Sequence, residues 1–349
     1  MLKKTLKDVA LAAGVSPATV SNALNNRRGV SDEIREKIFQ TARELGYSRE
    51  SGARKPAVRL VVLKRHGLVV SDTPFFAALI EGIEKQCRLQ GHELLVSHIH
   101  LPETDRADLL QRFSTDHAAG VIILATEMLP EDLALLSHLR IPVVLLDSRF
   151  LGCSYDCVLI DNEGAAFTAT GHLVEQGHRS IGYLFSAVPI QNFLDRAAGF
   201  RQALRQNGLQ PESCCRIALE PTLEGACRDM NKVLAERSGT LPTAFFADND
   251  IIACGAMKAL QERGFRVPED VSLVGIDDMP FCELTGPRLT TVRVFKQEIG
   301  GIAVRRLMEK IAGDPVVLQI EVGAELVVRD SVRRLSIQEP SDKPINRKR

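Results

Sequence analysis

The N-terminal part of the chain carries apolar side chains at the spacing of short amphipathic helices. Thr5 and Ser16 can each begin a helix, because a hydroxyl oxygen can accept the free N–H groups of the first turn. Pro17 suits a first helical position, and Gly14 can end the preceding helix. A third segment after Ser31 is apolar at Ile34, Ile38, Ala42 and Leu45. This pattern predicts a helix-turn-helix followed by a third helix.

The second of these helices is nearly bare of large side chains. Its sequence, PATVSNAL, offers mainly Val20 and Leu24 to a small core. Short polar side chains would let such a helix lie close to base edges in the major groove of DNA. Pro17 and Ala18 could touch thymine methyl groups, and Asn22 could pair with an adenine. Phosphates could be bound by Thr19, Ser21 and Asn25. The alternative is a polar surface helix without a ligand.

From residue 58 onwards, short apolar runs alternate with amphipathic stretches, which is typical of buried parallel strands connected by helices. The first series predicts strands at 58–63, 93–99, 120–126 and 142–147, with helices at 75–90, 105–117 and 130–139. The second series predicts strands near 180–185, 215–220, 243–248 and 271–276, with helices near 163–176, 192–207, 225–236 and 250–262. Two doubly wound parallel sheets follow from this alternation.

The composition is that of a globular protein, with 45% hydrophobic and 25% charged residues. Apolar runs of about eighteen residues are missing, and the N-terminal residues lack a secretory apolar stretch, so a cytoplasmic protein without a membrane partner is expected. The net charge is zero, yet residues 1–58 hold eleven Lys and Arg against six Asp and Glu. This asymmetry suggests that the N-terminal end contacts nucleic acid.

The sequence contains no pattern typical of a metal site or a catalytic centre. Its 8 cysteines lack CxxC spacing, and the nearest pair, Cys153 and Cys157, has no His close in sequence to complete a site. His172 and His178 flank a helix-to-strand connection, where a structural role is expected. Ser-His-Asp arrangements, phosphate loops and paired-carboxylate motifs do not stand out. We therefore expect neither an enzyme, nor a bound metal, nor a cofactor.

Two segments, LKDVALAAGVSPATVSNALN and VSDEIREKIFQTARELGY, closely resemble the N-terminal headpiece of LacI-type transcription regulators. By this resemblance, Pro17, Ala18 and Asn22 occupy positions that read the operator. The other candidate DNA contacts in the headpiece are Thr5, Ser16, Thr19, Ser21, Asn25, Val30, Ser31 and Tyr47. The resemblance therefore implies a double-stranded DNA operator as partner.

The segment after the headpiece departs from the family. Its members usually continue with Pro-Asn and a short hinge helix whose leucine wedges into the minor groove, whereas this chain reads GYSRESGARKPAVRL. Gly52 and Pro56 fall within the expected hinge, and both oppose helix formation. We therefore expect no ordinary hinge helix. Phosphate or groove contacts without a wedge are expected from Arg49, Arg54 and Lys55.

The resemblance continues through most of the chain and implies a periplasmic-binding-protein-like core of two subdomains joined by crossing strands. The alternating pattern alone would give two sequential domains. With the crossings, the expected parts are a headpiece (1–48), a linker (49–58), an N-subdomain (59–160 and 291–320), a C-subdomain (161–290 and 321–332) and a polar tail (333–349). The tail lacks leucine heptads, so we expect a homodimer formed through the core on a palindromic operator.

Polar residues at the carboxyl ends of strands indicate a binding site, because ligands of open α/β sheets lie beyond those ends. Asp147, Asn249 and Asp277 each end a predicted strand, and Arg196 opens a helix expected to face the same cleft. Separately, the aspartates could be caps and the arginine a surface ion pair. Together, the four match the family's effector-contact pattern. Further candidates are Thr73, Phe76 and Asn192.

The resemblance thus implies an effector-responsive transcription regulator, a repressor of a carbohydrate-use operon. Two carboxylates, a guanidinium and an amide suit a hydroxyl-rich sugar or polyol. Glu220 falls near a position where some relatives of the family place an aromatic residue on which a sugar packs, so the identity of the ligand stays open. A purine- or nucleoside-responsive regulator of the same family is an alternative, although the sequence does not clearly provide an aromatic stacking surface. A small-molecule-binding protein without DNA function is a further alternative, which the basic headpiece disfavours.

Overall fold

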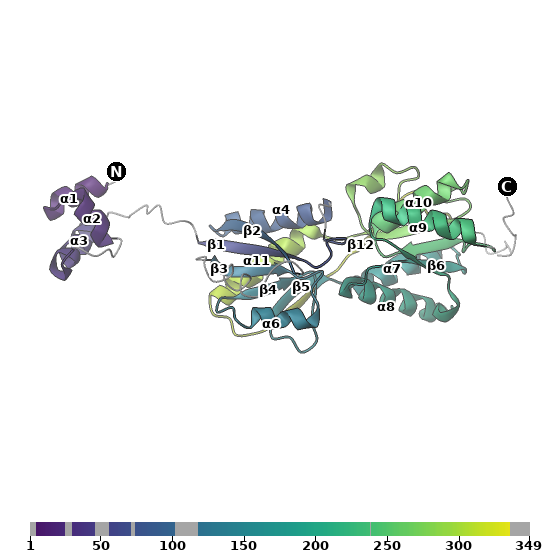
Figure 1. Cartoon of the computed structure of the whole chain (residues 1–349), viewed down its shortest axis with the longest axis horizontal. Coiled ribbons are helices and arrows are strands. Elements are labelled where there is room, and N and C mark those ends of the chain that lie inside the picture. The colour runs from purple at the N-terminus through teal and green to yellow at the C-terminus, as the bar shows by residue number, and fades with distance from the viewer. Residues whose placement is uncertain are drawn as a thin grey trace. The chain divides into compact units, whose positions relative to one another are not determined.

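The computed structural model describes residues 5–24, 30–45, 56–70, 74–101, 118–237 and 239–335 (Figure 1). The chain divides into two compact units, Met1–Lys55 and Pro56–Arg349. The predicted helix at 105–117 and the polar tail from 336 lie outside the described residues. So do six candidate site residues, namely Asn25, Tyr47, Arg49, Arg54, Lys55 and Thr73, and most of the segment in which no ordinary hinge helix is expected.

The first unit is a three-helix headpiece of α1 (Leu6–Ala13), α2 (Pro17–Leu24) and α3 (Asp32–Glu44). Thr5 begins α1 through a capping box, in which its hydroxyl accepts the Asp8 N–H and the Asp8 carboxylate accepts the Thr5 N–H at 2.7 Å. Gly14 ends α1 with φ 70°, a left-handed conformation that favours glycine. The core of this unit is centred on the fully buried Val9, Val20 and Ile38. The predicted helix-turn-helix is confirmed.

The second unit contains two six-stranded sheets (Figure 1). The first has the order β11-β5-β4-β3-β1-β2, with β1 (Ala57–Lys64), β2 (Glu93–His100), β3 (Ala118–Leu124), β4 (Val143–Leu146), β5 (Asp156–Ile160) and β11 (Gln319–Val322). Its helical elements are α4 (Pro74–Leu89), η1 (Pro130–Asp132), α6 (Leu133–Leu136) and α11 (Lys296–Ile311). Its strands pair in parallel. The central strands β1, β3, β4 and β5 are mostly buried, as their continuous apolar runs predict. The buried strand predicted at 93–99 is wrong in this respect, because β2 lies at the edge of the sheet and is largely exposed.

The second sheet has the order β12-β10-β9-β8-β6-β7, with β6 (Ile181–Ser186), β7 (Arg216–Leu219), β8 (Ala244–Ala247), β9 (Ser272–Asp277), β10 (Thr290–Arg293) and β12 (Glu325–Val327). Its helical elements are α7 (Asn162–Glu175), α8 (Gln191–Gln206), η2 (Pro211–Ser213), α9 (Leu223–Glu236), α10 (Asp250–Glu262) and η3 (Pro280–Glu283). All pairs are parallel except β10 with β12. Two doubly wound α/β subdomains are therefore present.

The chain crosses between the sheets three times: after β5, between β10 and α11, and between β11 and β12. Helix α11 packs on α4 and on β3, β4 and β5, although more than a hundred residues separate it from them in sequence. The contact with α4 is very close, because a Cβ atom on Gly82 would lie 2.1 Å from the carbonyl oxygen of Gln297. Glycine at this position therefore permits the return of the chain to the first sheet.

Several predicted boundaries differ from the structure. Residues 321–322, assigned to the C-subdomain, belong to β11 of the first sheet. Residues 291–293 belong to β10 of the second sheet and not to the first subdomain, because Thr291 pairs with Gly275 of β9. Strand β1 begins at Ala57, within the segment assigned to the linker. The helix predicted at 130–139 is only η1 followed by the four residues of α6. Within the described residues, no helix is both long and apolar enough to cross a bilayer.

Candidate functional site

Helix α2 carries the side chains that are predicted to contact base edges of the operator. Ser16, Pro17 and Ala18 are exposed, whereas Thr19 and Asn22 are half-buried. The Ser16 hydroxyl accepts the Thr19 N–H at 3.1 Å, so it begins the helix as predicted. Because Val20 and Ala23 are buried on the opposite side, the small polar residues form the outer face of α2. Thr5 and Ser31 are exposed, and Val30 is half-buried.

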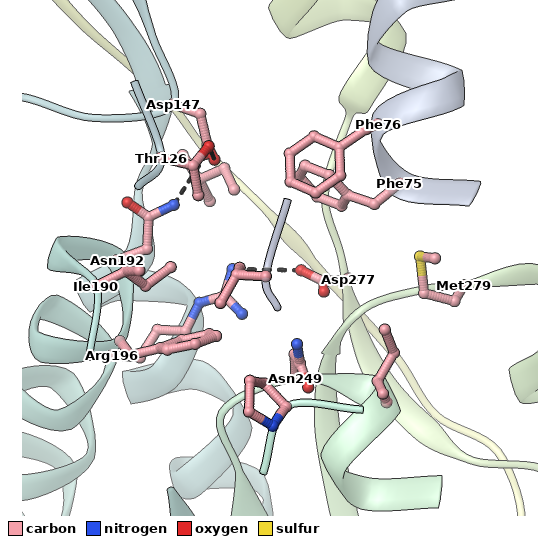
Figure 2. Close-up of a pocket in the computed structure, with 15 residues that line it drawn as sticks. Phe75, Phe76, Thr126, Asp147, Ile190, Asn192, Arg196, Asn249, Asp277 and Met279 are labelled. Carbon is pink, nitrogen blue, oxygen red and sulfur yellow. Dashed lines mark hydrogen bonds and ion pairs between the residues drawn. The ribbon is translucent and has the colours of Figure 1, made fainter. Parts of the chain in front are cut away.

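A cavity between the two sheets brings together every candidate effector residue that the structure describes (Figure 2). These residues are Phe76, Asp147, Asn192, Arg196, Asn249 and Asp277. They come from α4, the ends of β4, β8 and β9, and the first turns of α8. Both subdomains therefore contribute to one site at the carboxyl ends of the strands, as expected for an open α/β sheet. Sequence reasoning missed other lining residues, among them Thr126, Ile190, Phe193 and Met279.

Arg196 is the central cation of this cleft and is only 3% exposed. Its Nε donates to Asn162 Oδ1 at 2.8 Å, and its Nη2 donates to Asp277 Oδ1 at 3.2 Å. Its Nη1 donates to the backbone oxygen of Asp248 at 2.5 Å. These three acceptors fix the plane of the guanidinium, and its remaining N–H groups can donate to a ligand oxygen or nitrogen.

Asp147 forms the opposite wall of the cleft (Figure 2). Its carboxylate accepts hydrogen bonds from the Thr126 hydroxyl at 2.6 Å and from the Asn192 amide at 3.0 Å. Asn192 belongs to α8 of the second subdomain and Thr126 follows β3 of the first, so this carboxylate joins the two subdomains. Burial raises the pKa of Asp147 to about 6, although Thr126 and Arg196 oppose that shift.

This pKa leads to a prediction on stability. The pKa of Asp147 in the folded chain lies above its ordinary value of 3.8, so the folded state holds the proton more tightly and its stability falls as the pH rises from about 4 to about 6. Asp147→Asn removes this cost and should gain roughly 3 kcal/mol relative to the parent chain across that window. Urea unfolding at pH 4.5, 5.5 and 6.5 measures the difference.

Asp330→Asn is the matched control for this experiment. Asp330 is paired with Arg288 at 2.6 Å, and that hydrogen bond lowers the pKa of Asp330. The free energy of unfolding of Asp330→Asn, relative to that of the parent chain, should therefore not increase as the pH rises. A difference between Asp147→Asn and the parent chain that stays constant with pH would contradict the burial of an ionisable Asp147.

The backbone is strained at the same site. Among the described residues, the non-glycine positions with positive φ are Asp147 at 65°, Asp277 at 124° and Asp278 at 52°. Such conformations cost about 1 to 3 kcal/mol each and persist where surrounding contacts hold them, which is common at ligand sites. All three follow or end strands that point into the cleft. The strained positions therefore coincide with the candidate site.

Three aromatic rings also line the cleft. Phe75 and Phe76 of α4 form an edge-to-face pair with ring centroids 5.0 Å apart. The ring centroid of Phe193 of α8 lies 5.7 Å from Cζ of Arg196. The sequence did not clearly indicate an aromatic surface in the cleft beyond Phe76, whereas the structure places three rings there. Helical spacing hides this, because an aromatic residue on an amphipathic helix is indistinguishable from a core residue in the sequence alone.

Asn249 and the neighbouring Asp248 support the floor of the cleft. The Asn249 side-chain oxygen accepts the Ile252 N–H at 3.0 Å and caps α10, so its amide NH₂ is left for other partners. Behind it, the fully enclosed Asp248 accepts the Ser186 N–H at 2.7 Å and the Tyr183 hydroxyl. Burial raises the pKa of Asp248 to about 7. Sequence reasoning overlooked Asp248, because it reads as a strand end without a partner.

His178 has structural surroundings, as expected. The ring of His178 contacts the Thr243 hydroxyl at 2.9 Å and the Arg333 carbonyl oxygen at 3.1 Å. Burial lowers the pKa of His178 to about 4, so the ring is neutral near pH 7. In the described part of the chain, no group of three or more His, Cys, Asp and Glu is placed to hold a metal ion.

Comparison with known proteins agrees with both units. Residues 5–50 match the profile of bacterial regulatory proteins of the lacI family, and residues 170–332 match the periplasmic binding protein-like domain. The chain is similar to the HTH-type transcriptional repressor PurR of Mannheimia succiniciproducens, with 33% identity over 338 residues, 95% of this chain and 99% of that protein. It is also similar to PurR of Pasteurella multocida, with 33% identity over 337 residues, 94% of this chain and 98% of that protein.

Solved structures show the same architecture. The lac repressor dimer bound to operator and the anti-inducer ONPF has a TM-score of 0.71 and 26% identity, and the match covers 95% of this chain and 100% of that one. The complex of the transcriptional regulator CelR with cellobiose also has a TM-score of 0.71 and 26% identity, covering 94% of this chain and 100% of that one.

A helix-turn-helix headpiece on a two-sheet periplasmic-binding-like body defines the class, which is that of DNA-binding transcription regulators. This assignment agrees with the predicted class, since the similar proteins named above are transcriptional repressors and regulators. The chain belongs to the LacI family and is a DNA-binding transcriptional repressor.

Proposed function

We propose that this repressor is controlled by a small planar heterocycle of the nucleobase class, bound in the cleft between the subdomains. The observation that carries the proposal is the combination of aromatic walls with polar groups of both kinds. Phe75, Phe76 and Phe193 offer surfaces on which a flat ring can stack. A flat heterocycle can stack face to face on an aromatic side chain, whereas a sugar ring is puckered and carries hydroxyl groups. This cleft therefore suits a nucleobase better than the sugar first expected.

The polar groups suit the edge of such a ring. Asp147 and Asp277 can accept ring or exocyclic N–H groups, while Arg196, Asn192 and Asn249 can donate to carbonyl oxygens or ring nitrogens. The name PurR that the curated relatives carry is consistent with an effector of this class. A sugar or polyol is the second candidate, because the same five polar residues include enough donors and acceptors for hydroxyl groups and because the CelR structure holds cellobiose.

At the other end of the chain, we propose that α2 enters the major groove. Pro17, Ala18 and Asn22 would face base edges there. Further contacts with the DNA, to its phosphates or grooves, are assigned to Thr5, Ser16, Thr19, Ser21, Asn25, Val30, Ser31, Tyr47, Arg49 and Arg54. A two-fold dimer would place two such helices on the half-sites of a palindromic operator in the bacterial cytoplasm.

Control requires the effector to bind two arrangements of the subdomains with different affinities. A coupling free energy of about 1 to 3 kcal/mol changes operator affinity by roughly 5- to 150-fold. The carboxylate of Asp147, which is bonded from both subdomains, is one contact that a ligand in the cleft would compete with or strengthen.

A ligand panel tests the proposal. Thermal unfolding of the full chain should shift upward with hypoxanthine, guanine or adenine, and the same compound should change the affinity for an operator duplex selected by the protein from a random pool. Ribose, cellobiose and glycerol form the comparison arm. A shift with a sugar alone would replace the nucleobase by the second candidate, and no shift with any compound would overturn the assignment of the cleft.

A further inference from the structure

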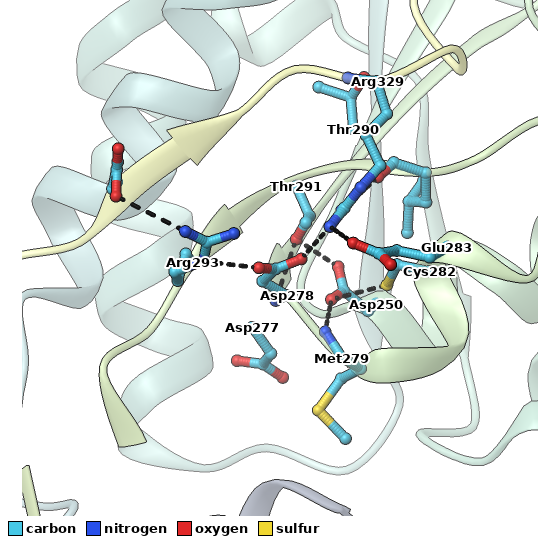
Figure 3. Close-up of polar contacts among 12 residues, drawn as sticks. Asp250, Asp277, Asp278, Met279, Cys282, Glu283, Thr290, Thr291, Arg293 and Arg329 are labelled. Atoms are coloured by element: carbon cyan, nitrogen blue, oxygen red, sulfur yellow. Dashed lines mark hydrogen bonds and ion pairs between the residues drawn. The ribbon is translucent and has the colours of Figure 1, made fainter. Parts of the chain in front are cut away.

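A tight turn follows β9 at the edge of the cleft, and we define the Asp277 turn as residues 277–279 (Figure 3). Its first two residues have φ values of 124° and 52°, which L-residues rarely adopt. Such a backbone persists only where its neighbours hold it in place. The direction of the Asp277 carboxylate, which meets Arg196 in the cleft, therefore depends on whatever holds this turn.

Asp278 is held by two arginines, as Figure 3 shows. Its carboxylate accepts Arg293 Nε at 2.7 Å and Arg329 Nη2 at 2.7 Å. The side chain of Asp278 is 10% exposed and that of Arg329 is 8% exposed, so this pair is largely removed from water. A charge-assisted bond in such surroundings is strong and directional.

Both arginines belong to segments that flank crossings between the subdomains. Arg293 is the last residue of β10, directly before the chain passes to α11. Arg329 follows β12, the strand that receives the chain from β11 of the first sheet. One carboxylate therefore joins two of the three connections, at a point adjacent in sequence to a residue of the cleft.

A third cation reaches the turn from the first subdomain. Lys296 begins α11, and its ammonium donates to the backbone oxygens of Asp277 and Asp278. The same ammonium lies 5.7 Å from the ring centroid of Phe75 in the cleft wall. The Asp277 turn thus contacts the first subdomain through its carbonyl groups and the connections through the Asp278 side chain.

The rest of the turn is fixed to the second subdomain. The Met279 N–H donates to Asp250 Oδ2 at 3.0 Å, and the Asp278 N–H donates to Thr291 Oγ1 at 3.3 Å. Asp250 is the first residue of α10, next to the cleft residue Asn249. Any movement of the connections relative to α10 must therefore deform or release the turn.

We propose that Asp278 is a positioning residue that couples the cleft to the connections between the subdomains. A change in the crossing segments pulls on its carboxylate, and the strained backbone transmits that change to the carboxylate of Asp277. The reverse follows by reciprocity, since a ligand that reorients Asp277 must shift the crossing segments. This inference rests on the proposed effector control of the cleft, but not on the chemical identity of the effector.

Asp278→Asn tests this role. Asparagine has nearly the same size, tolerates a positive φ and lacks the charge that holds the two arginines. We expect the affinity of the full chain for its selected operator duplex to change at least about fivefold in the absence of any effector, because the balance between subdomain arrangements shifts. Fluorescence anisotropy at constant salt measures the affinity, and thermal unfolding of the same samples reports the fold.

The matched control is Asp330→Asn, which makes the same chemical change one residue after Arg329. Asp330 is half-exposed and bonded to Arg288, away from the turn. It should leave the operator affinity within about twofold. A lower unfolding temperature with unchanged operator affinity in Asp278→Asn would show a role in stability alone and would overturn the inference.

Arg293→Gln provides a second variant if Asp278→Asn does not fold. Its side chain is 43% exposed, and its removal leaves the bond between Asp278 and Arg329 in place. The operator affinity should change in the same direction by a smaller factor, and an unchanged affinity would overturn the coupling. Because no effector is added, these outcomes are independent of the ligand panel, whose failure would bear only on the proposed effector.

Discussion

Replacement of Arg196 by Ala is expected to abolish the response to effector while the protein still binds its operator. The guanidinium is nearly fully buried and is held by Asn162, Asp248 and Asp277 at the centre of the cleft. Loss of two charge-assisted hydrogen bonds to a ligand, at about 1.5 to 3 kcal/mol each, corresponds to a decrease in affinity of roughly 100-fold or more. Isothermal titration with the compound found in the panel, followed by operator titration, measures both effects.

The removal also leaves the buried Asp277 carboxylate without the cation that is hydrogen-bonded to it, which can cost about 3 to 5 kcal/mol of stability. Circular dichroism and thermal unfolding must therefore accompany the binding data. Arg205→Ala is the matched control, since Arg205 lies on the same helix, is exposed and bonds Glu212 at 2.8 Å. It should behave like the parent chain. A folded Arg196→Ala variant that still responds to effector would show that the cleft is not the effector site.

Asn22→Ala is expected to weaken operator binding by about 1 to 3 kcal/mol and to relax the preference at one base pair. The amide is the only side chain of PATVSNAL that can form a bidentate pair with an adenine. Competition between the selected duplex and duplexes with single base-pair changes measures the loss of preference.

Gln40→Ala is the control for the headpiece, because this exposed amide of α3 bonds Glu44 at 3.0 Å within its own helix. We expect an operator affinity close to that of the parent chain. If Asn22→Ala keeps both the affinity and the base preference, α2 is not the helix that reads the operator.

Local chemistry made the headpiece predictable. The hydroxyls of Thr5 and Ser16 and the left-handed glycine at 14 act within a few residues of their own positions, so the sequence contains the whole cause of each helix end. The buried strands were predictable for a related reason, because continuous apolar runs of this length have few other uses in a globular chain. The crossings needed the family resemblance, since α11 and β5 meet only in three dimensions.

The candidate cleft was predictable only in part. Strand ends identified Asp147, Asn249 and Asp277, because the direction of a parallel sheet fixes where its carboxyl ends meet. Thr126 and Phe193 escaped notice, since one is an ordinary residue after a strand and the other resembles a core position of a helix. The positive φ of Asp278 also has no sequence signal, because it results from contacts with Arg293 and Arg329 far along the chain.

The late position of α11 and β11 has a consequence for biosynthesis. The first sheet takes its edge strand β11 and its packed helix α11 from residues made after those of β1 to β5 and of most of the second subdomain. During synthesis on the ribosome, the first sheet therefore lacks α11 and β11 until the strands β6 to β10 have been made. The second sheet also takes an edge strand, β12, from residues made after β11, so neither subdomain is complete until both late strands have been made.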